Sequence, residues 1–221
     1  PVGGRGLLLG GVAGVAPGRV VVIGGGIVGY NAAVIALGLG AQVTILERSI
    51  DRMRHLEEVL SGRVTLLMSS TLQIGASVAE ADVVIGAVLI PGALAPKLVT
   101  REMIRGMKQG AVLCDVAIDQ GGVAETSRPT THSDPVYSVD GVTHYCVANM
   151  PGAVARTSTI ALNNATLPFA VALANKGAKK AYADDPHLLN GLNIHDGQVT
   201  YKAVADALKL KYTTAQQALG M

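Results

Sequence analysis

The stretch VVIGGGIVGY, residues 21–30, decides the fold of this chain. An apolar run typical of a buried strand ends here on three consecutive glycines at 24–26, and Gly29 follows at the start of an Ala-rich helical pattern. Glycine weakens both strands and helices because it loses the most conformational freedom on folding. Its repeated use at a strand–helix junction indicates that something must approach the backbone more closely than a Cβ atom would allow.

The glycines at this junction have the spacing G-x-G-x-x-G, formed by Gly24, Gly26 and Gly29. In this motif the first glycine permits a sharp turn, the second lets a pyrophosphate lie against the backbone, and the third brings helix and strand together. The predicted helix begins near Ile27, and its free N–H groups and positive dipole end would face the pyrophosphate. Glu47 closes the next predicted strand, eighteen residues after Gly29, where a carboxylate accepts hydrogen bonds from an adenosine ribose. The combination predicts a dinucleotide site; the alternative is a tight, closely packed turn without a ligand.

The neighbouring residues Glu47 and Arg48 bear on the choice between NAD and NADP. An arginine can bind the 2′-phosphate of NADP. A carboxylate ~4 Å from that phosphate, however, costs about 4 kcal/mol per charge pair at an effective dielectric near 20. The sequence therefore favours NAD, although an ordinary solvated strand end is the alternative interpretation of Glu47.

Strands and helices alternate along the chain from Arg19 to Asp119. The predicted strands are apolar on both faces, which is typical of a parallel sheet covered by helices on both sides. We therefore predict an α/β fold, a doubly wound parallel sheet of the Rossmann type, within a dinucleotide-binding domain at residues 1–155. The predicted strands are 19–24, 41–47, 63–68, 82–88 and 110–118, and the predicted helices are 27–40, 49–62, 69–81 and 100–107, with Ser49 and Ser70 as N-caps.

The rest of the chain is less regular. The polar stretch 120–135 is interpreted as a loop or hairpin before an apolar run at 143–149. The pattern at 157–177 predicts a helix interrupted at Pro168, because proline removes a backbone donor and clashes with the preceding turn. Short helical pieces are expected near 184–192 and 201–210.

The composition argues against several classes of protein. The 221 residues carry a formal net charge of +2, with no Trp and one Phe, so we expect no nucleic-acid partner. No apolar run reaches the ~18 residues of a membrane span, and residues 1–18 resemble neither a signal peptide nor an anchor. Cys114 and Cys146 have no metal-ligand spacing and are expected to be buried and reduced, which fits a cytoplasmic protein. The five histidines show no metal pairing, and the loop-like start without Met is expected to lie partway through a larger protein.

A second polar group lies in CDVAIDQGG, residues 114–122. Asp115 and Asp119 are expected to close a strand, and the carboxyl ends of strands border the ligand crevice in open α/β sheets. Asp119 would then lie where a nicotinamide ring could bind, although position alone equally allows a loop-capping aspartate. Asn149 and Met150, after the last predicted strand, are similarly ambiguous, since Met is more often core filler.

These motifs together resemble the alanine dehydrogenase family, NAD-dependent enzymes that interconvert L-alanine with pyruvate and ammonium. The resemblance runs along nearly the whole chain, through GGGIVGYNAA (24–33), DVAIDQGGVAETSRPTTH (115–132) and HYCVANMPGAVARTST (144–159) to GLNIHDGQVT (191–200). The NAD-binding subunit of proton-translocating transhydrogenase shares the glycine loop and a similar DQGG region. The motifs SRPTTH and VANMPGAVARTST are not expected there.

The resemblance implies a role for individual residues. Asp119 corresponds to the active-site aspartate of the family, which works beside a histidine. Glu47 stands where the family more often has Asp, and Val88 and Leu89 would line the path toward the nicotinamide. The implied cofactor-binding set is Gly24, Gly26, Ile27, Gly29, Glu47, Arg52, Ser69, Val88, Leu89, Val116, Asp119, Asn149 and Met150.

The resemblance also implies that part of the enzyme is missing. In the family the histidine, together with an arginine and a lysine that grip the substrate carboxylate, belongs to an N-terminal domain that precedes the matched region. Residues 156–221 would then be a C-terminal helical segment of the substrate domain without its sheet. The chain alone should bind NAD but catalyse little, and the family implies a homo-hexamer.

Two other functions stay open on the sequence. The chain could be an NAD-binding subunit of a larger machine, as in transhydrogenase, which a separate partner or membrane subunit would favour. It could also be a structural or regulatory NAD-sensing domain. Alanine-dependent NADH production by the full-length protein would separate all three.

Overall fold

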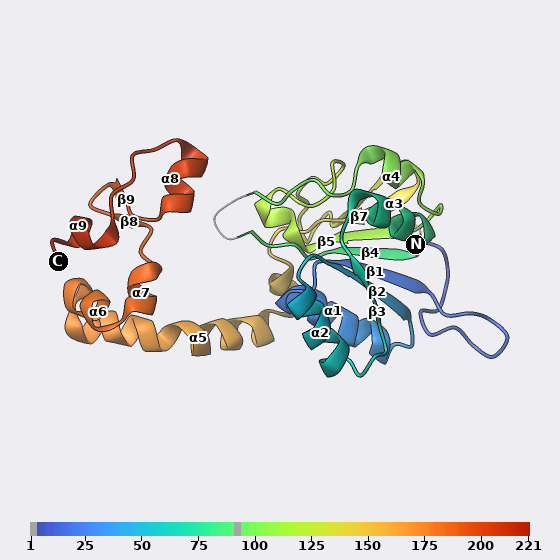
Figure 1. Ribbon diagram of the computed structural model, residues 1–221, viewed down its shortest axis with the longest axis horizontal. Helices are drawn as coiled ribbons and strands as arrows, with labels where there is room; N and C mark the ends of the chain where they lie inside the picture. The colour runs from blue at the N-terminus through green and yellow to red at the C-terminus, as the bar shows by residue number, and fades with distance from the viewer. Residues whose placement is uncertain (1–3, 91–93) are drawn as a thin grey trace. The chain divides into compact units, whose positions relative to one another are not determined.

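The computed structural model describes residues 4–90 and 94–221, which fall into two compact units. The first unit contains the described residues up to Met150, and the second contains residues 151–221. The helices and strands of both units are labelled in Figure 1.

The first unit is built on a seven-stranded sheet with the order β3-β2-β1-β4-β5-β7-β6. All neighbouring strands are parallel except β6 and β7, which form an antiparallel hairpin at one edge. This arrangement confirms the predicted doubly wound sheet. The stretch 120–135, predicted to be a loop or hairpin, is a loop, and the hairpin follows it at residues 136–145. The strands are β1 (Arg19–Ile23), β2 (Gln42–Glu47), β3 (Thr65–Met68), β4 (Val83–Gly86), β5 (Val112–Asp115), β6 (Val136–Val139) and β7 (Val142–Tyr145).

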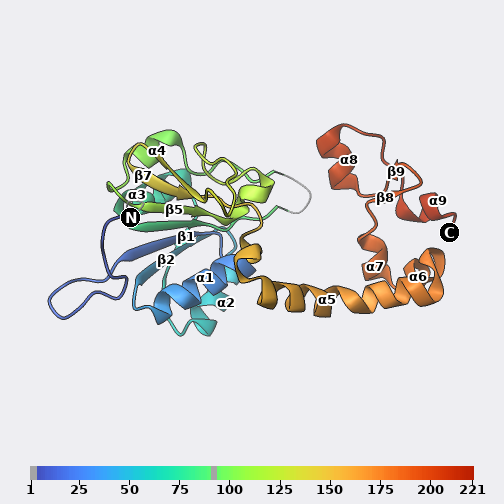
Figure 2. The same cartoon turned by 180° about the vertical axis from the view of Figure 1, so that it is seen from behind.

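Helices cover both faces of this sheet, as Figures 1 and 2 show from opposite sides. On one face lie α1 (Ile27–Gly38) and α2 (Ile50–Val59), and on the other lie α3 (Thr71–Glu80) and α4 (Arg101–Arg105). The predicted N-caps are confirmed: the Ser49 hydroxyl accepts from the Arg52 N–H and the Ser70 hydroxyl from the Gln73 N–H.

The core explains why the strands are apolar on both faces. In β1, Val20 and Val22 pack with residues of α1 and α2, whereas Val21 and Ile23 pack with residues of α3 and α4. Successive side chains of a strand point to opposite faces, so a sheet covered on both sides needs apolar residues at every position.

Two sequence expectations about the cysteines have different outcomes. Both are free thiols, as expected. Cys146 is fully buried, but the expectation that Cys114 is buried is wrong, since its residue is only partly covered. Cys114 lies in β5, on the face of that strand that points away from the buried Leu113 and Asp115.

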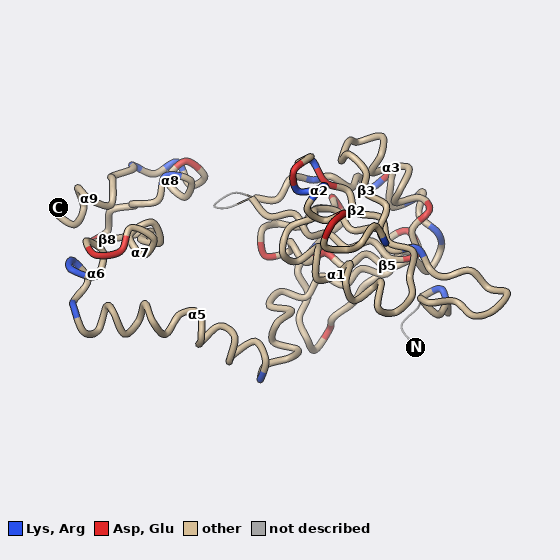
Figure 3. Tube along the Cα trace, turned by 60° about the horizontal axis from the view of Figure 1, so that its bottom comes forward, with Lys and Arg blue, Asp and Glu red and all other residues tan. Residues whose placement is uncertain are grey.

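The second unit begins with the short 3-10 helix η2 (Met150–Val154), which spans the boundary, and the long helix α5 (Ala155–Lys176). The predicted interruption at Pro168 is wrong, because α5 continues through this residue. Proline deletes a single hydrogen bond, and the other turns of this 22-residue helix keep theirs. Figure 3 shows that Lys, Arg, Asp and Glu are absent from α5 between Arg156 and Lys176.

The remainder of the second unit consists of short elements around a small apolar cluster of Leu192, Ala215 and Leu219. The helices predicted near 184–192 and 201–210 are confirmed, whereas a two-stranded hairpin and a last helix were not predicted. These elements are α6 (Ala178–Asp184), α7 (Pro186–Asn190), β8 (Ile194–His195), β9 (Gln198–Val199), α8 (Lys202–Leu208) and α9 (Ala215–Leu219). Within residues 4–90 and 94–221, no helix is both long and apolar enough to cross a membrane.

Candidate functional site

The carboxyl ends of β1, β2 and β4 border a cavity of about 470 Å³. The strand order reverses between β1 and β4, and ligands of open α/β sheets bind at such a switch point. Most of the lining is apolar, and Glu47, Arg48 and Ser69 form a polar end beyond β2 and β3. The lining residues are Gly24, Gly26, Ile27, Val28, Leu46, Glu47, Arg48, Ser69, Ala87, Val88, Leu89, Ile90, Pro96 and Leu98.

The three motif glycines at this cavity have different structural tasks. Gly24 has φ +98°, and a Cβ there would lie 2.7 Å from the Ala87 carbonyl oxygen. A Cβ on Gly29 would collide with the carbonyl oxygen of Gly24. A Cβ on Gly26, by contrast, would have no heavy atom of the described residues within 4 Å. Packing alone therefore accounts for Gly24 and Gly29, whereas Gly26 borders open space.

The helix α1 directs its N-terminus at the same place. Gly26 is its N-cap, so no side chain covers the first N–H groups of the helix. Free N–H groups and the helix dipole make such an end a site for anions. Ile27 and Leu89 are 81% and 68% exposed at the cavity, and large apolar side chains exposed around a cavity are typical of ligand sites. The site can hold an elongated ligand that has an anionic centre and apolar rings.

Glu47 ties the end of β2 to the glycine loop. Its Oε2 accepts a hydrogen bond from the Gly25 N–H at 2.8 Å, and its Oε1 accepts from the N–H groups of Arg48 at 2.7 Å and Ser49 at 3.0 Å. Burial tends to raise the pKa of Glu47, but these three N–H donors and the Arg52 guanidinium lower it below its ordinary value. A carboxylate has about four acceptor positions, so the ionised Glu47 still has one free for a ligand hydroxyl.

Two further residues of the implied set lie near Glu47 but differ in their relation to the cavity. Ser69 lines it, and the Ser69 N–H donates to the Glu47 carbonyl oxygen at 2.9 Å. Arg52 is outside the lining, and its Nε donates to the Gly25 carbonyl oxygen at 2.7 Å. Arg52 therefore supports the loop from behind, whereas the exposed Arg48 borders the cavity.

The other end of the cavity leads toward Asp119 through a small apolar cluster. Val88, which lines the cavity, packs against Ala95, Ala117 and Val123. Ala117 belongs to the 3-10 helix η1 (Val116–Gln120), which follows β5 directly. The expectation that Asp119 closes this strand is wrong, because β5 ends at Asp115 and the exposed Asp119 lies in η1.

The remaining predicted residues at this end are outside the cavity as the described residues define it. Val116 is partly buried at the start of η1, and Asp119 is exposed. Asn149 has a left-handed backbone with φ +60°, and its carbonyl oxygen accepts from the His132 Nε2 at 3.0 Å. Met150 begins η2.

Sequence reasoning missed several residues that line the cavity. Ala87 and Ile90 follow β4, and Pro96 and Leu98 belong to the segment that leads to α4. The signal for Ala87 and Ile90 was available, because residues just after a strand at the switch point face the ligand crevice. Pro96 and Leu98 had no local signal.

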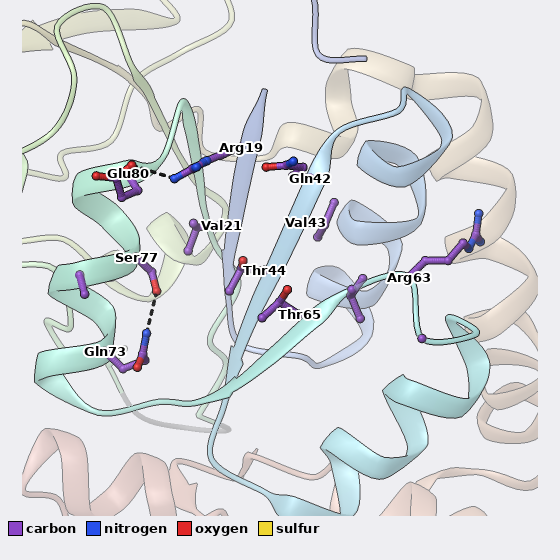
Figure 4. Close-up of a pocket in the computed structure, with 13 residues that line it drawn as sticks. Arg19, Val21, Gln42, Val43, Thr44, Arg63, Thr65, Gln73, Ser77 and Glu80 are labelled. Carbon is purple, nitrogen blue, oxygen red and sulfur yellow. Dashed lines mark hydrogen bonds and ion pairs between the residues drawn. The ribbon is translucent and has the colours of Figure 1, made fainter. Parts of the chain in front are cut away.

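A second cavity, of about 550 Å³, lies near the amino ends of β1, β2 and β3 (Figure 4). Two polar contacts lie in its lining: Arg19 Nη1 lies 2.7 Å from Glu80 Oε2, and Gln73 Nε2 donates to Ser77 Oγ at 3.4 Å. Because it lies at the ends of the strands opposite the glycine loop, this cavity is not the candidate site.

A doubly wound sheet, a G-x-G-x-x-G loop and an acidic residue after the second strand define a dinucleotide-binding domain of the Rossmann class. The family model described as "Alanine dehydrogenase/PNT, C-terminal domain" matches residues 1–202. The chain therefore belongs to this family, as the resemblance of its motifs indicated.

Individual relatives agree with this assignment. The alanine dehydrogenase of Halomonas elongata is 62% identical over 218 residues, which cover 99% of this chain and 59% of that protein. A solved L-alanine dehydrogenase superposes with a TM-score of 0.86 at 52% identity and covers 94% of this chain and 57% of its own. A transhydrogenase from Sinorhizobium meliloti gives a TM-score of 0.62 at 30% identity, over 70% of this chain and 45% of its own. The chain thus spans about 59% of the length of its curated relative, and its likeness to transhydrogenase is the weaker one.

Proposed function

We propose that this chain is the NAD-binding part of an enzyme that converts L-alanine, NAD⁺ and water to pyruvate, ammonium, NADH and a proton. The observation that carries the proposal is the ionised Glu47, which is hydrogen-bonded to the glycine loop at one end of the switch-point cavity. The 62% identity to an alanine dehydrogenase supports the substrate.

The residues of the cavity would bind the cofactor in order along its length. The open side of Gly26 and the N-terminus of α1 at Ile27 would hold the pyrophosphate, with Gly24 and Gly29 shaping the turn. Glu47 would accept hydrogen bonds from the adenosine ribose through its free acceptor position. The other residues proposed to contact or support the cofactor are Arg52, Ser69, Val88, Leu89, Val116, Asp119, Asn149 and Met150.

The nicotinamide cofactor, when bound, supplies the hydride acceptor for the alanine α-carbon. This chain's residues would hold it, exclude water through Val88 and Leu89, and present Asp119 near the reacting end. The Asp119 carboxylate is exposed on η1 and free to serve a substrate as a proton acceptor or as a charge opposite the iminium product of alanine oxidation. We propose that a histidine and the groups that bind the substrate carboxylate come from outside this chain. By family resemblance, the complete enzyme is a cytoplasmic homo-hexamer.

Steady-state oxidative deamination by the complete enzyme tests this function. NADH formation is followed at varied alanine concentration, and NAD affinity is measured separately by calorimetry. Asp119→Asn keeps the side chain's size but removes its charge, so turnover should fall by about 10²-fold or more with little change in NAD affinity. Asp140→Asn is the control, because Asp140 lies in the β6–β7 turn and forms surface ion pairs with Arg101 and Arg105.

Two results would count against the proposal. NAD binding without alanine turnover by the complete enzyme would favour a subunit related to transhydrogenase, whose own test is hydride transfer between two nicotinamide dinucleotides. Unchanged turnover in Asp119→Asn would show that the Asp119 carboxylate has no role in the reaction.

A further inference from the structure

The loop at residues 121–127 follows η1 directly and is hydrogen-bonded to Lys97, a residue outside the lining of the cofactor cavity. The Lys97 ammonium donates to the carbonyl oxygens of Gly121, Gly122 and Ala124; the bonds to Gly122 and Ala124 are both 3.0 Å long. An ammonium has three donors and no acceptor, so all three donors of Lys97 point into this one loop.

The same 121–127 loop is held through its N–H groups by Asp115. The Asp115 Oδ2 accepts from the Val123 N–H at 2.8 Å, the Ala124 N–H at 3.3 Å and the Ser127 hydroxyl at 2.5 Å. Asp115 is completely buried. Asp115 precedes η1, whereas the residues that donate to its carboxylate follow η1. These hydrogen bonds therefore join the two ends of a segment that contains Asp119.

Two glycines make room for the buried carboxylate. Gly122 has φ +77°, and a Cβ there would lie 2.7 Å from Asp115 Oδ2. A Cβ on Gly86, the last residue of β4, would collide first with the Val123 side chain and would lie 3.0 Å from Asp115 Oδ1. A buried charge is costly unless it is hydrogen-bonded, and all three bonds of this carboxylate go to Oδ2, whereas Oδ1 has no partner among the described residues. The missing side chain at Gly122 therefore leaves room for the oxygen that holds the loop.

Lys97 also connects this loop to the wall of the cofactor cavity. Its neighbours Pro96 and Leu98 both line the cavity. The segment that contains them is hydrogen-bonded along the backbone to η1 and to the loop: the Ala95 N–H donates to the carbonyl of Gln120, the last residue of η1, at 2.8 Å, and the Leu98 N–H donates to the Val123 carbonyl at 2.8 Å. A shift of the loop would therefore also move Pro96 and Leu98, which form part of the cavity wall.

We propose that Lys97 and Asp115 are positioning residues that fix Asp119 relative to the cofactor by clamping the 121–127 loop from its carbonyl and N–H sides. The proposal rests on the proposed function, in which Asp119 acts on the substrate. The five-residue η1 is too short to hold its own geometry, since 3-10 turns have poorer hydrogen bonds than α-helices. Both ends of η1 are instead held by charged groups, Asp115 before it and Lys97 at the residues after it. This matters because a misplacement of about 1 Å at a reacting group can lower the rate by about 10²-fold.

The test uses the complete enzyme with Lys97→Met, which keeps the length of the side chain but removes its donors. We expect kcat to fall by about 10-fold or more, while the Kd for NAD and the KM for alanine change by less than about 3-fold. Lys97→Arg, which keeps the charge and several donors, should recover most of the turnover. The control is Lys108→Met, because Lys108 also donates to a carbonyl oxygen, that of Glu80 at 2.6 Å, but near the amino end of β4, where it also pairs with Asp82 at 3.3 Å.

A double variant distinguishes positioning from a general structural role. If Lys97 acts through Asp119, then Lys97→Met added to Asp119→Asn should lower kcat by less than about 2-fold further. Losses that multiply would overturn the clamp proposal and leave the role of Asp119 intact, as would a loss of NAD affinity as large as the loss of kcat. Unchanged turnover in Asp119→Asn would instead refute the role proposed for Asp119, and the clamp proposal with it, while alanine turnover itself would still support the proposed function.

Asp115→Asn provides a second, milder variant. Its amide oxygen can accept from the same three donors, although without the charge that strengthens those bonds. We expect a smaller fall in kcat than in Lys97→Met and again little change in NAD affinity. A larger effect on NAD affinity than on kcat in this variant would contradict the proposal.

Discussion

The preference for NAD over NADP should depend on one carboxylate, that of Glu47. Its pKa is lowered below the ordinary value by backbone N–H groups and Arg52, so it is ionised at neutral pH. A 2′-phosphate on the adenosine ribose would lie directly against this charge. Glu47→Gln keeps the side-chain length and one acceptor oxygen, and it removes the charge together with the second acceptor oxygen.

The size of the effect follows from the position of Glu47 between protein and solvent. A charge pair ~4 Å apart repels by about 4 kcal/mol at an effective dielectric of 20 and by about 1 kcal/mol in bulk water. Glu47 is only partly buried, so the repulsion falls between these limits. Each 1.36 kcal/mol is about a factor of ten, so the ratio of NADP to NAD dissociation constants should narrow by roughly 5-fold to 10³-fold in Glu47→Gln.

Calorimetric titration of both cofactors measures this ratio for wild type and variant. NAD affinity itself should also fall, because the amide cannot accept from Gly25, Arg48 and Ser49 as the carboxylate does. Glu57→Gln, an exposed carboxylate on α2, removes the same charge from the protein and should leave the ratio unchanged. An unchanged ratio in Glu47→Gln, or NADP binding as tight as NAD in the wild type, would refute the reasoning.

Three further predictions concern the loop, a buried histidine and a thiol. Gly26→Val should nearly abolish NAD binding with an unchanged melting temperature, whereas Gly29→Ala should lower the melting temperature because its Cβ meets the Gly24 carbonyl; equal affinity in Gly26→Val would limit the glycines to packing. Burial lowers the pKa of His144, so the unfolded chain takes up a proton that the folded chain refuses: the free energy of unfolding should decline as the pH falls below about 6.5, and urea titrations of His144→Gln should lack that part of the decline. Burial raises the pKa of Cys114 to about 11, so its reaction with a disulfide reagent at pH 8 should be far slower than that of a free thiol; labelling as fast as glutathione would contradict this.

The local features of the sequence determined the class of fold. Strands that are apolar at every position can be stable only between two helical layers, and this was visible without coordinates. The N-caps Ser49 and Ser70 and the packing of Gly29 against Gly24 act on residues three to five positions away, so they too could be predicted. Local reasoning failed at Pro168, where a helix interruption was predicted. The effect of one missing hydrogen bond depends on the length of the helix around it, and α5 continues through the proline.

Only the tertiary structure decided which polar groups meet. Glu47 bonds to Gly25 because parallel pairing brings the ends of β1 and β2 to one edge, and Lys97 meets the 121–127 loop because the segment after β4 runs beside it. Sequence marked Asp115 and Asp119 as one polar group. The fold separated them into a buried carboxylate that organises a loop and an exposed one that faces outward from η1. A side chain's type sets which bonds it can form, but the strand order and the path of the loops set which atoms lie within 3 Å of it.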